Sequence, residues 1–184
     1  NRALANAIKT NAIDDLARNF KKVGSFDTHF SVETTKQNIH NQKSSGRCWL
    51  FSGLNVLRSN FARNHKDTLR VELSHVYLSF HDQLEKANLM LQGVIDNANK
   101  PMDDPMVQFF FKSPIGDGGT FCGVADLVDK YGLVPMEVMP ESYSAENTSR
   151  MASIISSKLR EYGLELRKMV ANKKPAAAIK ARKT

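Results

Sequence analysis

The segment 48-CWLFSGLNVLRSNF-61 constrains the fold more than any other part of the chain. Its main apolar positions, Leu50, Leu54, Leu57 and Phe61, recur every three or four residues, which is the spacing of an α-helix. Other apolar side chains, including Trp49, widen this surface until it nearly surrounds the helix. A helix of this kind has to lie in the middle of a domain, so we expect other elements to pack around it.

This helix is predicted to begin at Cys48, directly after the polar turn 42-QKSSGR-47. A helix N-terminus offers unpaired N–H groups and a partial positive charge of roughly half a unit, which favour an anion. The thiolate is the attacking form of cysteine, so this placement suits a nucleophile. Gly46 permits a tight turn, and the side-chain amide of Gln42 can donate to an oxyanion.

Composition limits the class of protein. The chain has 184 residues, with 41% hydrophobic and 24% charged, as in a globular soluble domain. No apolar run approaches the roughly 18 residues of a membrane span, and no signal-peptide core follows the first residues. Two cysteines, Cys48 and Cys122, are too few for a disulfide scaffold and lack zinc-binding spacing. We therefore expect a cytoplasmic protein with no membrane, metal or cofactor, although an upstream segment that has been removed stays possible.

The net charge of +7 is concentrated in one place. Residues 167–184 contain seven basic side chains and no acidic one, whereas the rest of the chain carries 19 of each sign. A terminal run of this kind is usually solvated. A non-enzymatic module that binds nucleic acid through this tail is the alternative function, and a thiol redox protein using Cys48 and Cys122 is a third.

Apolar spacing and capping residues predict the other elements. Apolar residues at every fourth position from Leu4 predict one helix that Gly24 ends, followed by an extended segment over 25–41. Ser74 is expected to cap a helix that ends near Gly93, Thr120 to cap one that Gly132 ends, and Asn147 or Thr148 to cap a long last helix. We expect Phe109 to Phe111 to be buried and the alanine- and lysine-rich end beyond Pro175 to be frayed.

These elements divide the chain into three predicted parts. Residues 1–24 form an N-terminal helix, residues 25–146 form the helical part that bears the nucleophile, and residues 147–184 form a helical extension with the basic tail. No internal repeat is visible in the sequence.

Three separated segments resemble one known family. In QKSSGRCWLFS, the residues Gln42, Gly46, Cys48 and Trp49 resemble the nucleophile segment of papain-like cysteine peptidases, in the branch of bleomycin hydrolase and bacterial aminopeptidase C. The segments ELSHVYLSFHDQLEKAN (72–88) and GDGGTFCGVADLVDKYGLVPMEVMPES (116–142) are also similar to segments of that branch, in the same order.

The resemblance implies an α+β papain-like fold, of which this chain covers mainly the helical N-terminal half. It implies a thiol peptidase of the aminopeptidase type in which Cys48 attacks the substrate carbonyl and Gln42 helps to hold the oxyanion. Gly118 and Gly119 match the glycine pair that aligns the substrate main chain, and Trp49 belongs to the same substrate-binding region. Peptides are the implied substrates.

The family places its catalytic histidine and asparagine in a second, β-rich half, well over a hundred residues beyond the cysteine. None of the five histidines of this chain has the matching context; they are His29, His40, His65, His75 and His81. We expect His75 and His81 to be exposed or partly packed on the helix that follows Ser74, and one interpretation of His40, near the turn, is a local hydrogen-bonding partner. We therefore expect the missing half of the same protein to be a partner of this chain. Without that half, we expect the chain to be inactive and to expose apolar surface. The resemblance also implies a homo-oligomer, a hexameric ring, and in some members binding of nucleic acid. We expect Cys122 to be a small packed residue, although a disulfide with Cys48 stays open.

Overall fold

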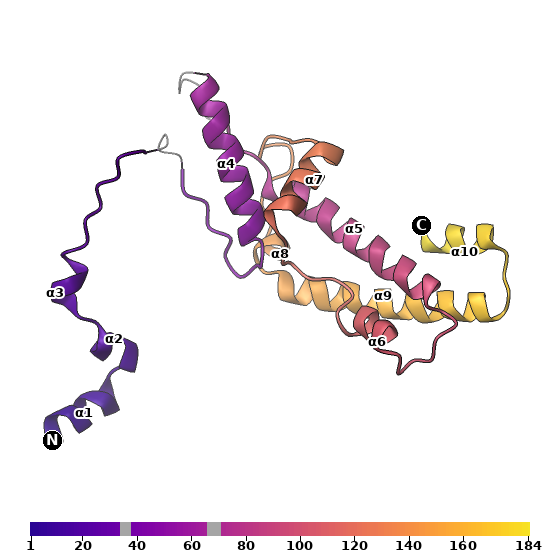
Figure 1. The fold of residues 1–184 in the computed structure, drawn as a ribbon, viewed down its shortest axis with the longest axis horizontal. Coiled ribbons are helices and arrows are strands. Elements are labelled where there is room, and N and C mark those ends of the chain that lie inside the picture. The colour runs from indigo at the N-terminus through magenta and orange to yellow at the C-terminus, as the bar shows by residue number, and fades with distance from the viewer. Residues whose placement is uncertain (34–37, 66–70) are drawn as a thin grey trace. The chain divides into compact units, whose positions relative to one another are not determined.

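The computed structural model describes residues 1–33, 38–65 and 71–184 (Figure 1). The chain divides into two compact units, Asn1–Thr34 and Thr35–Thr184. Within the described ranges all regular structure is helical, apart from isolated β-bridges that join Ser44 to Asn147 and Leu73 to Pro135. In the same ranges, no helix combines the length and the apolar character needed to cross a membrane.

The first unit contains three short helices where one was predicted. They are α1 (Arg2–Thr10), α2 (Ile13–Ala17) and α3 (Phe20–Val23). The break after α1 has a local cause, because the Asn11 side chain donates to the carbonyl of Ala7 at 3.0 Å while its backbone turns extended. Asparagine competes with the helix for backbone hydrogen bonds in this way. The predicted domain boundary at residue 24 stays a prediction.

The second unit is built on α4 (Cys48–Asn64), α5 (His75–Asp96) and α7 (Phe121–Tyr131). Six buried residues form their shared core: Leu50, Leu54, Leu73, Leu78, Val124 and Leu127. The predicted helix from Cys48 is confirmed, but it is not buried on all sides, since Val56 is 49% exposed. The predicted cap of α5 is also confirmed, because the Ser74 hydroxyl accepts from the Tyr77 N–H.

A second core joins α5 to α6 (Pro105–Lys112) and to α9 (Thr148–Ala171). Its buried members are Met90, Leu91, Val94, Ile115, Leu159 and Leu166. Phe110 and Phe111 pack against this core as predicted, but the prediction for Phe109 is wrong, because its side chain is 67% exposed. The short α6 turns one face to the core and therefore leaves one of three consecutive phenylalanines outside.

The C-terminal end is ordered, so the prediction of a frayed end is wrong. A short helix, α8 (Tyr143–Glu146), precedes α9. After α9 the chain turns into α10 (Ala176–Lys183), which packs back against α9 (Figure 1). Ile179 packs against the second core, and both Oε atoms of Glu165 accept from the guanidinium of Arg182 at 2.8 Å. One apolar side chain and one bidentate pair therefore hold a helix whose sequence alone shows no apolar face.

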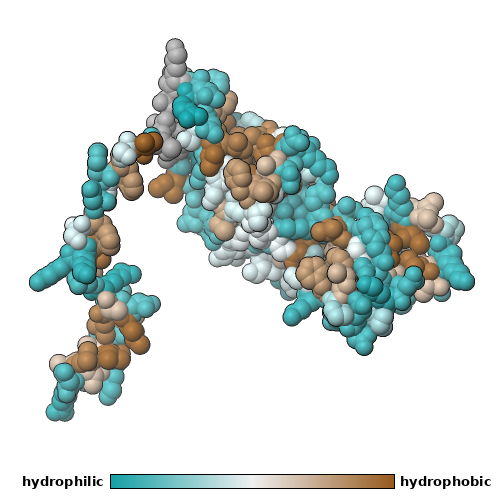
Figure 2. Space-filling model, viewed as in Figure 1, coloured by the Kyte–Doolittle hydropathy of each residue, from teal (hydrophilic) through white to brown (hydrophobic). Residues whose placement is uncertain are grey.

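Large apolar side chains remain at the surface of the second unit (Figure 2). Leu89, Phe109 and Phe121 each expose more than 60% of their surface. These residues agree with the expectation that the chain presents apolar surface to a further segment, which stays a prediction.

Candidate active site

Cys48 is the first residue of α4, and its thiol is free and exposed. The polar turn before it is closed by two reciprocal hydrogen bonds. The Gln42 amide donates to the Ser45 carbonyl at 2.7 Å, and the Ser45 hydroxyl donates to the Gln42 carbonyl at 2.6 Å. One amide N–H of Gln42 is thus occupied within the turn, and the other is the one that can serve an oxyanion.

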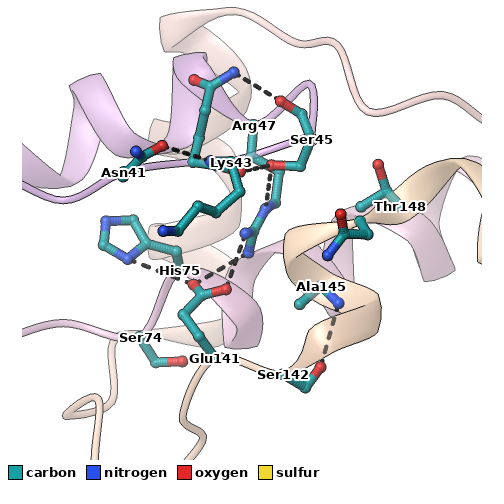
Figure 3. Close-up of polar contacts among 12 residues, drawn as sticks. Asn41, Lys43, Ser45, Arg47, Ser74, His75, Glu141, Ser142, Ala145 and Thr148 are labelled. Atoms are coloured by element: carbon teal, nitrogen blue, oxygen red, sulfur yellow. Dashed lines mark hydrogen bonds and ion pairs between the residues drawn. The ribbon is translucent and has the colours of Figure 1, made fainter.

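A buried ion pair anchors the residue directly before the nucleophile (Figure 3). Arg47 is 1% exposed, and its Nη1 and Nη2 donate to the two carboxylate oxygens of Glu141 at 3.2 and 2.9 Å. Its Nε donates to the Ser45 hydroxyl at 3.0 Å. Bidentate pairing of this kind fixes orientation as well as charge. This pair was not predicted from the sequence, because 94 residues separate its members and no local pattern marks it.

His75 lies beside this pair and is fully buried, so its expected exposed or partly packed placement is wrong. Its ring stacks on Phe51 with a centroid distance of 3.8 Å and lies 5.2 Å from the ring of His40. Burial lowers the pKa of His75 to about 3, helped by repulsion from His40 when that ring is protonated and from the guanidinium groups of Arg47 and Arg58. A neutral His75 cannot form an ion pair with Glu141, whose nearest carboxylate oxygen is 3.9 Å from Nδ1.

His40 belongs to a separate polar cluster. Its Nε2 lies 2.9 Å from the Glu72 carboxylate, and its Nδ1 lies 3.0 Å from Nη1 of Arg58. Because the guanidinium can only donate, Nδ1 accepts and the ring proton sits on Nε2, facing Glu72. His40 is thus a local hydrogen-bonding partner, as one interpretation of the sequence expected. In the described part of the chain, no histidine bonds to the Cys48 thiol.

The glycine turn, 115-IGDGGT-120, lies against Trp49, the residue after the nucleophile. The Trp49 indole N–H donates to the Asp117 carbonyl at 2.6 Å. The Trp49 ring also covers Gly119, where a Cβ atom would stand only 2.5 Å from it, whereas a Cβ at Gly118 would meet nothing within 4 Å. The fold therefore brings together the predicted substrate-binding residues Trp49 and Gly119, although their roles stay predictions.

Lys86 of α5 holds the same turn from another element. Its ammonium donates to the carbonyls of Gly116 and Gly118 at 2.8 and 2.7 Å and to Asp82 at 2.6 Å. All three of its N–H donors thus have acceptors. Burial raises the pKa of Asp82, and the bond from Lys86 opposes this effect. Lys86 was not predicted from the sequence, because it lies in the middle of an ordinary helical pattern.

A groove of about 370 Å³ adjoins Gly118. Its walls are mostly apolar and include Leu89, Met90, Phe110 and Ile115. With the charge of Lys86 satisfied by the turn, this groove suits an apolar side chain placed beside the glycine pair.

Cys122 is exposed at the start of α7, so its predicted packed position is wrong. Its neighbour Gly123 faces the Trp49 ring instead, with the site of its absent Cβ 3.4 Å away. Both thiols are free, and no bond between Cys48 and Cys122 is present.

Comparison with known proteins shows which family this chain is similar to. A family model described as "Peptidase C1-like family" matches residues 1–184. The chain is 41% identical over 184 residues to aminopeptidase G of Lactobacillus delbrueckii subsp. lactis, a match that covers 100% of this chain and 42% of that protein. It is 42% identical over 135 residues to bleomycin hydrolase of Gallus gallus, covering 72% of this chain and 30% of that protein. The crystal structure of PepW from Lactobacillus rhamnosis HN001 superposes with a TM-score of 0.90 at 37% identity and covers 99% of this chain and 41% of its own. The chain thus spans less than half the length of these relatives.

Proposed function

Since the chain belongs to the Peptidase C1-like family, we propose that it carries the nucleophile of a thiol peptidase of the aminopeptidase type. The papain-like fold predicted from the sequence is confirmed, with this chain forming its mainly helical N-terminal part. One observation carries the proposal: Cys48 is a free, exposed thiol at the start of α4, next to a tryptophan that packs on the glycine turn.

The proposed reaction is acyl transfer through the Cys48 sulfur. The thiolate attacks the carbonyl carbon of the scissile amide, and the carbonyl oxygen becomes an oxyanion. The free amide N–H of Gln42 and the backbone N–H of Cys48 donate to this oxyanion. The C–N bond then breaks, the amine leaves with a proton from a general acid, and water hydrolyses the thioester to regenerate the thiol. The backbone of Gly118 and Gly119 holds the substrate main chain alongside.

The general acid and base is proposed to be a histidine outside residues 1–184, oriented by an asparagine there. The described histidines support this assignment through their surroundings. His75 is buried and neutral, His40 is engaged by Glu72 and Arg58, and His81 stacks on Tyr131 at 3.9 Å. A segment that brings such a histidine would also cover exposed apolar side chains of the second unit.

We extend the proposal to assembly and location. Peptides are the proposed substrates, the active protein is proposed to be a homo-oligomer, a hexamer by its resemblance to the family, and the cytoplasm is its proposed compartment. Light scattering coupled to size-exclusion chromatography of the active protein checks the proposed homo-oligomer, and a monomer at micromolar concentration contradicts it.

Labelling and turnover test the function. An epoxysuccinyl inhibitor of thiol peptidases is expected to modify Cys48 in a full-length protein that contains this sequence, as read by mass spectrometry of its peptides. Cys48→Ala is expected to abolish hydrolysis of aminoacyl amides, while Cys122→Ser, which removes the other exposed thiol, is the matched control and retains it. Activity that survives Cys48→Ala contradicts the proposal.

The alternative, a module that binds nucleic acid through residues 167–184, gains no support from the structure of this segment. Arg167 donates to the carbonyls of Asn97 and Lys100, Arg182 pairs with Glu165, and Lys183 donates to Gln92. Part of the basic charge is therefore used to dock the tail on the body of the chain.

A further inference from the structure

Three segments that are distant in sequence meet at Asp117. They are the turn before Cys48, the glycine turn itself, and the start of α9. Their meeting point is a single partly buried aspartate, whose carboxylate and backbone carbonyl each bind a different part of the nucleophile segment.

The carboxylate of Asp117 binds two donors through one oxygen. Oδ2 accepts from the backbone N–H of Gly46 at 3.0 Å and from the hydroxyl of Thr148 at 2.5 Å. Thr148 is buried, and its own N–H donates to the carbonyl of Ser44 at 3.4 Å. Hydrogen bonds to an ionised acceptor are about twice as strong as neutral ones. The turn is therefore tied to α9 both directly and through the aspartate.

The backbone carbonyl of Asp117 fixes the other side of the nucleophile, where it accepts from the Trp49 indole at 2.6 Å. One residue thus holds Gly46, two positions before Cys48, and Trp49, one position after it. The contact at Gly46 is close enough to exclude any larger residue, since a Cβ there would lie 2.7 Å from the Cβ of Asp117.

Lys86 restrains Asp117 itself. Its ammonium binds the carbonyls of Gly116 and Gly118, the residues on either side of the aspartate. The glycine turn is thereby attached to α5 as well as to the nucleophile segment.

The geometry points to Asp117 as a positioning residue that keeps Cys48 in register with the backbone of Gly118 and Gly119. This role rests on the proposed function, because the register matters only where a substrate lies along the glycine turn and faces the thiol. Loss of the carboxylate frees Gly46 and lets the two turns shift relative to each other. A displacement of about 1 Å at a reacting centre can reduce the rate about 100-fold.

The test uses the 184-residue chain in a Cys122→Ser background, so that Cys48 is its one thiol. Asp117→Ala removes the acceptor, Asp117→Asn keeps a carbonyl oxygen in its place, and Thr148→Val removes one of the two donors. Asp129→Asn, at an exposed position of α7, is the matched control.

The first measurement is hydrogen exchange of the Gly46 N–H by NMR, which requires no turnover. Asp117→Ala is expected to raise the exchange rate roughly 10- to 100-fold, the loss expected for one charge-assisted hydrogen bond. Asp117→Asn is expected to restore most of the protection, and Thr148→Val to raise exchange about threefold, because the carboxylate loses its second tether. Protection in a folded Asp117→Ala chain equal to that of Asp129→Asn overturns the assignment. If the alanine variant does not fold, Thr148→Val decides, and exchange no faster than in Asp129→Asn overturns it.

The second measurement, made on a full-length protein that contains this sequence and carries the same substitutions, separates alignment from reactivity. The rate of Cys48 alkylation by iodoacetamide, a small reagent with no need for the glycine turn, is expected to change less than the rate of labelling by a peptidyl epoxysuccinate. The ratio of the two rates is expected to fall about tenfold in Asp117→Ala and to recover in Asp117→Asn. An unchanged ratio in Asp117→Ala overturns the positioning role. Failure of the unsubstituted full-length protein to take the peptidyl reagent instead counts against the proposed function and leaves the exchange result to judge the contact.

Discussion

The guanidinium of Arg47 and the carboxylate of Glu141 form two N–H···O bonds of 3.2 and 2.9 Å, one residue before the thiol of Cys48. The arginine is 1% exposed and the glutamate side chain 24%, so the pair is largely withdrawn from water. It joins the nucleophile turn to the segment that leads into α8.

Removing one partner of this ion pair is expected to destabilise the folded chain strongly. Arg47→Met leaves the Glu141 carboxylate without its partner and should lower the free energy of unfolding by about 3 kcal/mol, measured by urea denaturation. Arg63→Met, at an exposed arginine of α4, is the control and should change this free energy little. The double variant Arg47→Met/Glu141→Leu should be less damaged than Arg47→Met, because no buried charge is left unpaired. A double variant less stable than the single one contradicts this account.

His75 makes stability depend on pH in the acid range. Its folded-state pKa of about 3 lies below the usual value of 6.5, so the unfolded chain binds the extra proton first as pH falls. The contribution of His75 is therefore complete above about pH 6.5 and is lost between there and about pH 3. His75→Leu should flatten the difference in unfolding free energy between pH 7 and pH 4.5, whereas His29→Leu, at an exposed histidine, should not. Parallel pH curves for the parent chain and His75→Leu would show that His75 is not the group responsible.

The contact of Trp49 with Gly119 distinguishes the two glycines of the turn. Gly119→Ala places a Cβ 2.5 Å from the ring and should push the indole out, whereas Gly118→Ala adds a methyl group to open space. Trp49 is the one tryptophan of the sequence, so its fluorescence reports this change directly. We expect a red shift, stronger acrylamide quenching and a loss of about 1–3 kcal/mol in stability for Gly119→Ala. Equal spectra for the two variants would refute the close packing.

Gln42 is predicted to serve the oxyanion with the amide N–H that the turn leaves free. In a full-length protein with this sequence, Gln42→Ala should lower kcat by about 100- to 1000-fold. Ser45→Ala is the matched control, since it removes the other hydrogen bond of the reciprocal pair, from the Ser45 hydroxyl to the Gln42 carbonyl, and keeps the amide of Gln42. A similar loss in both variants would assign the effect to the turn rather than to the oxyanion.

Local features of the sequence predicted the helices well. The start of α4 at Cys48, the Ser74 cap of α5 and the end of α7 at Gly132 all follow from residues within one turn of the position concerned. The first unit shows the limit of this reasoning. The apolar spacing from Leu4 to Phe20 continues through Asn11, but the asparagine side chain bonds to the backbone and ends α1 there.

The residues of the candidate site likewise fall into those that the sequence identified and those that it did not. Cys48, Gln42, Trp49 and the glycine pair were identified from short motifs and a family resemblance. Asp117 and Lys86 were missed, because their contacts with the nucleophile segment and the glycine turn span 30 to 71 residues and leave no periodic signal. Cys122 was expected to be a small packed residue because the family resemblance gave no role for a thiol at this place, but it is exposed at the start of α7.

The sequence alone is enough to predict that a cysteine begins an apolar helix after a glycine-containing turn, because helix periodicity and turn chemistry act between near neighbours. Three further features come from tertiary packing: Arg47 is buried against Glu141, His75 is buried and neutral beside that pair, and α10 packs on α9. Those outcomes depend on which helix faces meet and on how much water each contact excludes. Both are properties of the packed chain rather than of any short segment of it.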